Sequence, residues 1–142
     1  MKGTRMPSDP VEVFHQGLDL LLDKDMDGFI GLFTDDAVME FPFAPPGRPD
    51  RLEGHAAVHE YLIGYPDWLD LRRIKDSTVH QTHDPRVIIA EFSAEGVVVA
   101  SGEPYQARYI SVVTIRDGRI AHFRDYWSPL VFFQVTDGGG KS

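Results

Sequence analysis

The sequence predicts an α+β fold in which helices come first and a long antiparallel sheet follows. Two patterns carry this prediction. Before residue 65, apolar residues recur mainly at helical spacing, whereas from Leu71 onward four strand-like segments are separated by turn residues. Helices grouped ahead of consecutive strands are typical of α+β folds. Long, curled strands packed on helices leave room for a pocket between sheet and helices.

The composition limits the class of protein. The 142 residues are 42% hydrophobic and 25% charged, which is ordinary for one soluble globular domain. A formal net charge of -8 argues against binding to nucleic acid or to an anionic membrane. The chain has no cysteine, and its first ten residues lack the apolar core of a signal peptide. We therefore expect a single cytoplasmic domain over 1–142 with loose tails at 1–8 and 137–142.

Two helices are predicted at the start of the chain. Asp9 is a capping residue, Pro10 suits a first helical turn, and Glu12 completes a capping box. Asp25 can cap a second, shorter helix that ends near Phe33. The apolar residues that repeat at helical spacing are Phe14, Leu18, Leu21 and Leu22 in the first helix, and Met26, Phe29, Ile30 and Phe33 in the second.

A strand, a rigid loop and a third helix are predicted next. The strand covers 37–43, and the three prolines of 44–49 exclude regular structure after it. The helix covers about 54–64 and ends before Pro66. The residues Asp67, Trp68 and Leu69 then form a turn that can cover an opening.

The remainder is predicted as four strands, at about 71–82, 86–99, 104–116 and 119–128. The segments between them are His83-Asp84-Pro85, Ser101-Gly102-Glu103 and Asp117-Gly118, which have the residue types of turns. Strands joined by such short turns are expected to be antiparallel neighbours.

Asp125 is the residue on which the functional prediction centres. In a strand alternate side chains share a face, so Ala121, Phe123, Asp125 and Trp127 are expected on one side. An ionised carboxylate on an apolar face is costly unless it has a partner or a chemical task. Asp125 is therefore either a general acid/base with a raised pKa or half of a buried structural pair with an arginine or tyrosine.

Other polar residues extend the candidate site. Glu91, among Ile89, Ala90 and Phe92, is predicted as a second catalytic carboxylate, with a solvated strand face as the alternative. Tyr105, Tyr109 and Ser111 share a strand face and are either hydroxyl donors or ordinary sheet residues. The residues predicted to bind substrate are Glu40, Phe41, His55, His59, Tyr61, Trp68, Tyr109, Ser111, Phe123 and Trp127.

The sequence predicts no metal site and no cofactor. His55 and His59 have the i, i+4 spacing of a zinc-binding helix, but no glutamate stands beside the first histidine as in a metalloprotease motif. We expect them to line the pocket or to lie on the surface. Glu40, on the same strand face as Val38, is expected either at the pocket mouth or exposed to solvent.

The chain resembles the nuclear transport factor 2-like superfamily. The features that carry the resemblance are the helix pair, the strand ending in Glu40-Phe41-Pro42-Phe43, the helix after Gly54 and the hairpin at Asp117-Gly118-Arg119-Ile120, from about Val11 to Val135. Within it, the chain resembles the SnoaL-like and ketosteroid-isomerase-like group. That resemblance implies a cone-shaped barrel, in which a curved, mostly antiparallel sheet wraps three N-terminal helices. It also implies a homodimer through the outer face of the sheet, which carries Arg108, Ile110, Val112 and Thr114.

Local strings resemble the phenazine-biosynthesis A/B proteins. They are Pro66-Asp67-Trp68, Asp84-Pro85 with Glu91 beyond, and Arg124-Asp125-Tyr126-Trp127-Ser128-Pro129. The last string holds a glutamate acid/base in that family, and the matching residue here is the shorter Asp125. The third helix has no clear match for the family's pocket histidine, although His55 and His59 lie near that position.

Three functional hypotheses remain open. The first is a cofactor-free isomerase, cyclase or dehydratase that acts on a small, hydrophobic, oxygenated compound of the polyketide, steroid or phenazine-precursor kind. In it, Asp125 moves a proton and tyrosine or histidine groups stabilise the developing oxyanion. The second is a protein that binds such a ligand without chemistry, and the third is a protein-interaction module. Fold alone does not decide between them.

Overall fold

The structure is a computed structural model that describes residues 9–128. The tails predicted at 1–8 and 137–142 lie outside the described residues. The elements, in chain order, are α1 (Pro10–Leu22), α2 (Met26–Ile30), β1 (Phe33–Glu40), β2 (Arg51–Glu53), α3 (His55–Leu62), α4 (Tyr65–Trp68), β3 (Leu69–Gln81), β4 (Val87–Val98), β5 (Pro104–Arg116) and β6 (Arg119–Trp127).

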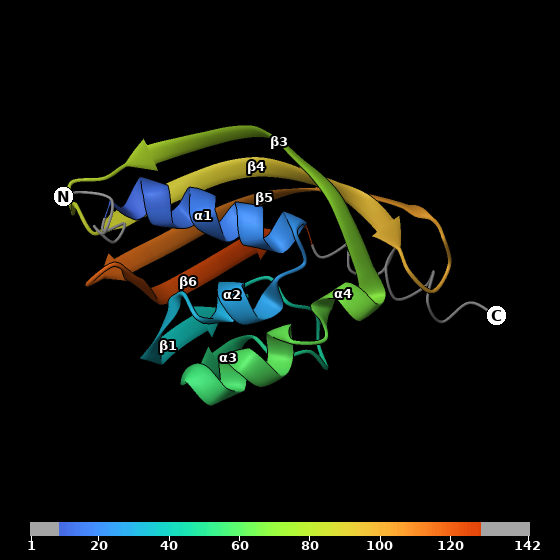
Figure 1. The fold of residues 1–142 in the computed structure, drawn as a ribbon, viewed down its shortest axis with the longest axis horizontal. Coiled ribbons are helices and arrows are strands. Elements are labelled where there is room, and N and C mark those ends of the chain that lie inside the picture. The colour runs from blue at the N-terminus through green and yellow to red at the C-terminus, as the bar shows by residue number, and fades with distance from the viewer. Residues whose placement is uncertain (1–8, 129–142) are drawn as a thin grey trace.

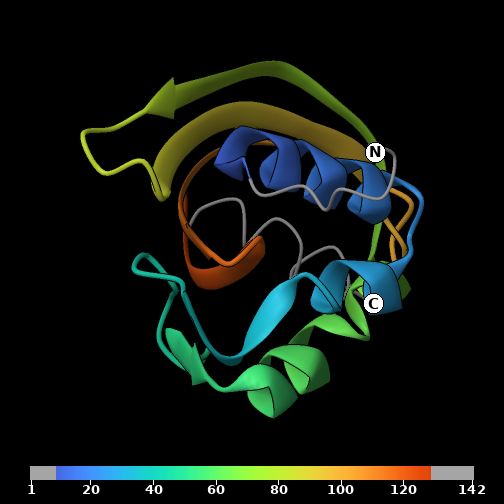
Figure 2. The same ribbon diagram turned by 60° about the vertical axis from the view of Figure 1, so that its left-hand side comes forward.

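The strands form one curved sheet, which confirms the predicted α+β class. Its order is β2-β1-β6-β5-β4-β3, and every neighbouring pair is antiparallel except the parallel pair of β1 and β6. The sheet bends around α1, which lies on its concave side (Figures 1 and 2). The curve does not close into a barrel, because β2 and β3 remain at opposite edges.

The helix starts follow the predicted capping chemistry. The Asp9 carboxylate accepts a hydrogen bond of 2.9 Å from the backbone N–H of Val11, and Asp25 accepts one of 2.8 Å from Gly28. These bonds satisfy N–H groups that have no partner within a helix. Each cap sets the residue at which its helix begins, and α1 and α2 contact each other.

Three elements differ from the prediction. β1 begins at Phe33 and ends at Glu40, so the predicted second helix is shorter and the strand starts earlier. The short edge strand β2 was not predicted. Pro66 lies in the first turn of α4, where its missing N–H costs nothing, instead of ending the helical region.

A bulge in β6 changes which residues face inward. Thr114 of β5 pairs with His122, but the next residue, Ile115, pairs with Ile120, so Ala121 has no partner across the strands. Ile120 is therefore buried, whereas Ala121 is half-buried. The predicted inward face holds from Phe123 onward but is wrong for Ala121.

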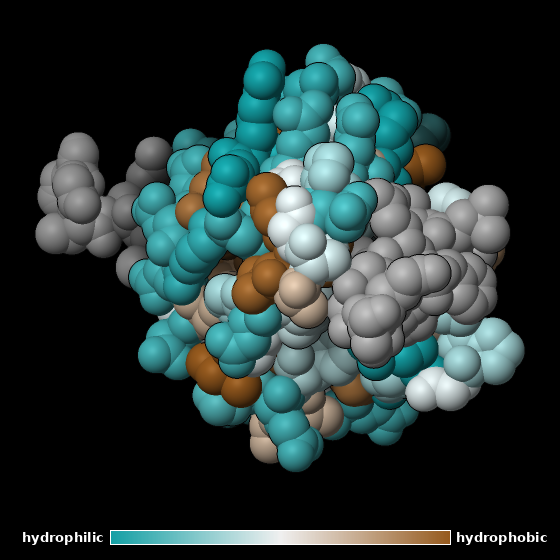
Figure 3. All heavy atoms as spheres, turned by 90° about the vertical axis from the view of Figure 1, so that its right-hand side faces the viewer, coloured by the Kyte–Doolittle hydropathy of each residue, from teal (hydrophilic) through white to brown (hydrophobic). Residues whose placement is uncertain are grey.

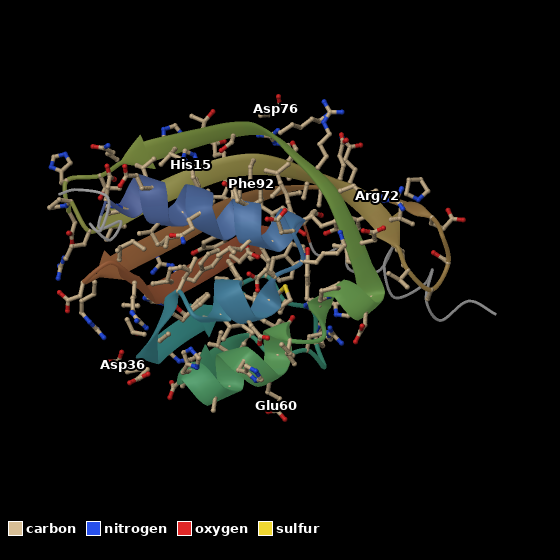
Figure 4. All side chains as sticks on the ribbon, in the orientation of Figure 1. His15, Asp36, Glu60, Arg72, Asp76 and Phe92 are labelled. Carbon is tan, nitrogen blue, oxygen red and sulfur yellow. The ribbon has the colours of Figure 1, made fainter. Side chains whose placement is uncertain are left out.

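The hydrophobic core lies between the concave face and the helices. Its most buried side chains include Val13 of α1, Phe33 of β1 and Val113 of β5, each with no exposed surface. Phe92 projects from β4 on the side of α1 (Figure 4), and its ring lies 5.9 Å from that of Phe14. The core therefore fixes α1 against the strands that line the site.

Candidate active site

A cavity of about 140 Å³ lies between the concave face of the sheet and the helices. A single water molecule needs about 10–15 Å³ by the same measure, so the cavity holds a molecule with at least one ring. Aromatic and aliphatic side chains dominate its wall. They are Phe14, Leu18, Leu21, Phe29, Met39, Phe41, Tyr61, Leu62, Tyr65, Trp68, Leu71, Ile74, Phe92, Ala94, Tyr105, Tyr109, Ile120, Phe123 and Trp127, joined by Gly17, Arg48 and Asp125.

The cavity opens between α4 and the loop that follows β1. Among the described residues that line it, Arg48 and Trp68 are the exposed ones, and Trp68 keeps 37% of its surface accessible. Ile63 and Val99 are also exposed, and the backbone N–H of Val99 bonds to the carbonyl of Trp68 at 3.1 Å. Figure 3 shows the face on the α4 side, where hydrophobic residues stand among mainly hydrophilic ones.

Asp125 is the carboxylic acid of the cavity wall. It lies directly across from Ser111 in the β5–β6 ladder, and the Ser111 hydroxyl donates a hydrogen bond of 3.2 Å to Asp125 Oδ1. Burial raises the pKa of the Asp125 carboxyl to about 7, and the bond from Ser111 opposes that rise. The structure shows no ion pair between Asp125 and another described residue, which argues against the structural-pair interpretation. Both the protonated and the ionised form are therefore populated near neutral pH.

Four tyrosines surround this acid. Burial raises the pKa of Tyr105 to about 12. It also raises the pKa values of Tyr109 and Tyr65 well above that of a free tyrosine. The negative charge of Asp125 raises all three pKa values further. Burial likewise raises the pKa of Tyr61. The hydroxyls of Tyr105 and Tyr109 are hydrogen-bonded to each other. Because one hydroxyl donates to the other, the pair keeps one O–H that can donate to a ligand oxygen.

Arg48 brings a positive charge to the mouth of the cavity. Its guanidinium donates a hydrogen bond to the hydroxyl of Tyr61, and both this bond and the positive charge lower the pKa of Tyr61 against the effect of burial. The charge of Asp125 acts on the same hydroxyl in the opposite direction. Arg48 and Asp125 therefore lie within interaction range of one tyrosine.

Most of the predicted binding residues do line the cavity. They are Phe41, Tyr61, Trp68, Tyr109, Phe123 and Trp127, with Asp125 among them. Ser111 is fully buried behind the wall, where it contacts Asp125. The structure thus brings together residues that are separated by more than 80 positions in the chain.

Four predicted residues lie elsewhere. Glu91, predicted as a second catalytic carboxylate, points to the outer face of β4, where its carboxylate bonds to His80 at 2.8 Å, and it does not line the cavity. Glu40 is on the outer face of β1 and bonds to His122 at 2.6 Å and to Arg51 at 3.0 Å. It does not reach the pocket mouth, because its neighbours Met39 and Phe41 take the inward face.

The two histidines of α3 are also outside the cavity. His55 is half-buried and its Nε2 lies 3.1 Å from the carbonyl oxygen of Ile30. His59 is exposed. The inward face of α3 is taken by Val58 and Leu62, which are buried at helical spacing from each other. Neither histidine contributes to the site.

Besides several apolar side chains, two polar residues of the wall, Arg48 and Tyr65, were not singled out by sequence reasoning. Arg48 lies in the proline-rich loop, where no periodicity shows which way a side chain points. Tyr65 lies in α4 directly before Pro66, where the sequence predicted the end of the third helix. No group of three or more potential metal ligands gathers anywhere in residues 9–128. Within the same range, no helix is long and apolar enough to cross a membrane.

Comparison with known proteins identifies the family. The model of the SnoaL-like domain matches residues 14–123. The chain belongs to the SnoaL-like family. This family is part of the nuclear transport factor 2-like superfamily, as the sequence motifs predicted.

Several relatives of this SnoaL-like chain match along most of its length. YesE of Bacillus subtilis is 42% identical over 89% of the chain and 86% of YesE. The PhzA/B-like protein PA3332 of Pseudomonas aeruginosa is 37% identical over 89% of both chains. A crystal structure from Bacillus subtilis, described as a candidate isomerase, superposes with a TM-score of 0.88 at 41% identity and covers 92% of this chain and 94% of that one.

More distant structures share the fold alone. A candidate polyketide cyclase from Xanthomonas campestris has a TM-score of 0.76 at 17% identity, over 89% of this chain and 95% of its own. At this level of identity the similarity shows the fold and not the chemistry, because one fold serves many functions.

Proposed function

We propose that this protein is a cofactor-free enzyme that isomerises, cyclises or dehydrates a small, hydrophobic, oxygenated ring compound, with Asp125 as the proton-transfer group. The observation that carries the proposal is a carboxyl group with a pKa of about 7 in the wall of an apolar cavity. A general acid or base works best when its pKa lies near the working pH. The isomerase description of the Bacillus subtilis structure, at 41% identity, supports the same reaction class.

The geometry supports a simple sequence of proton transfers. Ionised Asp125 takes a proton from a carbon next to a ligand carbonyl. The electron pair of the broken C–H bond forms the C=C bond of an enolate, and the π electrons of the carbonyl move to its oxygen. The free O–H of the Tyr105–Tyr109 pair donates to that developing oxyanion. Protonated Asp125 then returns the proton to another carbon in an isomerisation, or to a hydroxyl that leaves as water in a dehydration.

The reaction class can be tested before the substrate is known. In deuterium oxide, the protein should catalyse the exchange of the protons next to the carbonyl of small cyclic ketones and enones. Proton NMR measures the rate of this exchange. Asp125→Asn keeps the shape of the side chain but removes its basic oxygen. Exchange that is equally fast with wild type and Asp125→Asn would leave ligand binding without chemistry as the function.

We also propose that the protein forms a homodimer through the outer face of its sheet. Ile110 is 44% exposed there and lies between Glu91 and Tyr126 in the strand register. The ring of Phe43, itself 53% exposed, packs edge-to-face on Tyr126 at 5.3 Å. An exposed apolar stripe flanked by charged residues is typical of an interface between protein chains.

A further inference from the structure

We propose that the ligand of this cavity is a planar ring compound that carries an anionic group, and that Arg48 binds this group at the cavity mouth. The inference rests on the proposed use of the cavity as a ligand site and names the class of ligand. It does not depend on whether chemistry follows binding.

The first argument is the charge at the opening. Arg48 is exposed, lines the cavity and is the one positively charged residue among the described lining residues, in a chain of net charge -8. A neutral, apolar ligand would gain nothing from a guanidinium at this position. A guanidinium presents several N–H donors in one plane and matches the two oxygens of a carboxylate.

The second argument is the hydrogen bond between Arg48 and Tyr61. Arg48 donates to the Tyr61 oxygen, so the hydroxyl hydrogen of Tyr61 remains available as a donor. The mouth therefore offers guanidinium N–H groups and a phenolic O–H side by side. An oxygen anion accepts from both, whereas a cation or an apolar group accepts from neither.

The third argument is the wall between the two charged residues. The ring of Tyr61 lies 5.1 Å from that of Phe41, and Phe41 packs edge-to-face on Trp127 at 5.6 Å. Trp127 follows Asp125 by two residues on the same face of β6. The three rings thus form a continuous aromatic wall from the mouth to the acid, which suits a flat ring held by its anionic end.

The test compares two probes that differ in charge. Binding of 2-naphthoate and of neutral 2-naphthamide is measured by isothermal titration calorimetry at pH 6, where Asp125 is mainly protonated, with wild type, Arg48→Met and Arg119→Met. Arg119 is exposed on the β5–β6 hairpin, so its variant loses the same charge away from the cavity. The preference of wild type for naphthoate already tests the proposal without any variant.

We expect wild type and Arg119→Met to bind naphthoate about tenfold more tightly than naphthamide. Arg48→Met should bind the two probes about equally, with naphthamide affinity close to that of wild type. Equal binding of both probes by wild type, or a preference that survives in Arg48→Met, would refute the anionic class while leaving the cavity a ligand site. Failure of wild type to bind either probe would refute the proposal as well. The exchange assay with Asp125→Asn tests the enzymatic function separately.

Discussion

Asp125 and Glu40 lie on neighbouring stretches of β6 and β1 but on opposite faces of the sheet, and their carboxyl groups behave in opposite ways. On the concave face, burial raises the pKa of Asp125 to about 7. On the outer face, the hydrogen bond with His122 lowers the pKa of Glu40 below its ordinary value, with Arg51 adding to the effect. The difference comes from the surroundings of each group and not from the carboxyl chemistry itself.

Successive side chains of a strand point to opposite faces of the sheet, so the carboxyl groups of this protein lie in two different environments. Glu40, Glu91 and Glu95 share the outer face with basic partners, at 2.6 Å to His122, 2.8 Å to His80 and 2.7 Å to Lys75 respectively. Their carboxylates take part in ion pairs on the outer face. Asp125 has a serine in place of a basic partner, so its proton is available for transfer.

The largest expected effect separates Asp125 from Glu91. Asp125→Asn should slow the catalysed exchange of ligand protons by roughly 10²- to 10⁴-fold, the usual contribution of a positioned acid or base. Glu91→Gln should leave the exchange rate unchanged, because that side chain bonds to His80 on the outer face. Equal losses in the two variants would remove the distinction between the faces.

The pH dependence of stability should also differ in sign between the faces. The folded-state pKa of Asp125 is raised from 3.8 to about 7. The folded protein is therefore most stable with respect to this group below pH 3.8, and it loses stability as the pH rises from 3.8 to about 7. Asp125→Asn avoids that cost. Thermal and urea unfolding should therefore show the variant to be up to about 4 kcal/mol more stable than wild type at pH 8, and nearly equal to it at pH 4.

Glu40→Gln is the matched variant on the outer face. Its folded-state pKa is lowered from 4.5, so the ionised group stabilises the fold above that value and the benefit is lost as pH falls through the folded pKa. The variant should be less stable than wild type at pH 8 by roughly 0.5–1 kcal/mol, the range for partly exposed pairs.

If Asp125→Asn lost stability at pH 8, Asp125 would have to be a structural residue.

A third prediction concerns the outer face as an interface. Ile110→Glu places a charge in the exposed apolar stripe, and an unpaired charge is costly once it is buried between two chains. The dissociation constant of the proposed dimer should rise about 100-fold, as measured by sedimentation of the purified protein at several concentrations. Arg119→Glu, on the hairpin, serves as a charge control. Identical sedimentation of wild type and Ile110→Glu would contradict the interface.

The fold followed from local signals where those signals were strong. Asp117-Gly118 joins β5 to β6, and the caps at Asp9 and Asp25 begin α1 and α2 as predicted. The edge strand β2 could not be predicted, because three residues after a proline-rich loop carry no period. The bulge at Ala121 also leaves no mark in the sequence, since it arises from how β5 and β6 fit together.

The site was predictable to the extent that it lies on regular strands. Asp125 and Phe123 were placed correctly by alternation. The same alternation places Glu91 on the outer face, because its neighbours Ala90 and Phe92 point inward. Arg48 could not be placed, because the direction of a loop side chain depends on contacts that form only in the folded chain. The raised pKa of Asp125 likewise depends on how many side chains enclose it.

The smallest expected effect concerns Ser111, which is the one side chain shown to bond to Asp125 among the described residues. Its hydroxyl donates to the carboxyl, and a bond to the ionised form lowers a pKa. Ser111→Ala should therefore raise the pKa of Asp125 above 7, by roughly one pH unit, since a hydrogen bond to a charged group is worth about 1.5–3 kcal/mol at ordinary lengths and this one is long at 3.2 Å.

Carbon-13 NMR of aspartate-labelled protein can follow this change, with the Asp125 signal assigned by its absence in Asp125→Asn. Ser93→Ala is the matched control, because Ser93 is the other buried serine of the described chain and accepts a hydrogen bond of 2.9 Å from Arg108, away from the cavity. The pH profile of the exchange reaction should move upward with the Asp125 pKa in Ser111→Ala and stay in place in Ser93→Ala. A carboxyl pKa that falls in Ser111→Ala would mean that the serine accepts from protonated Asp125 instead of donating to its ionised form.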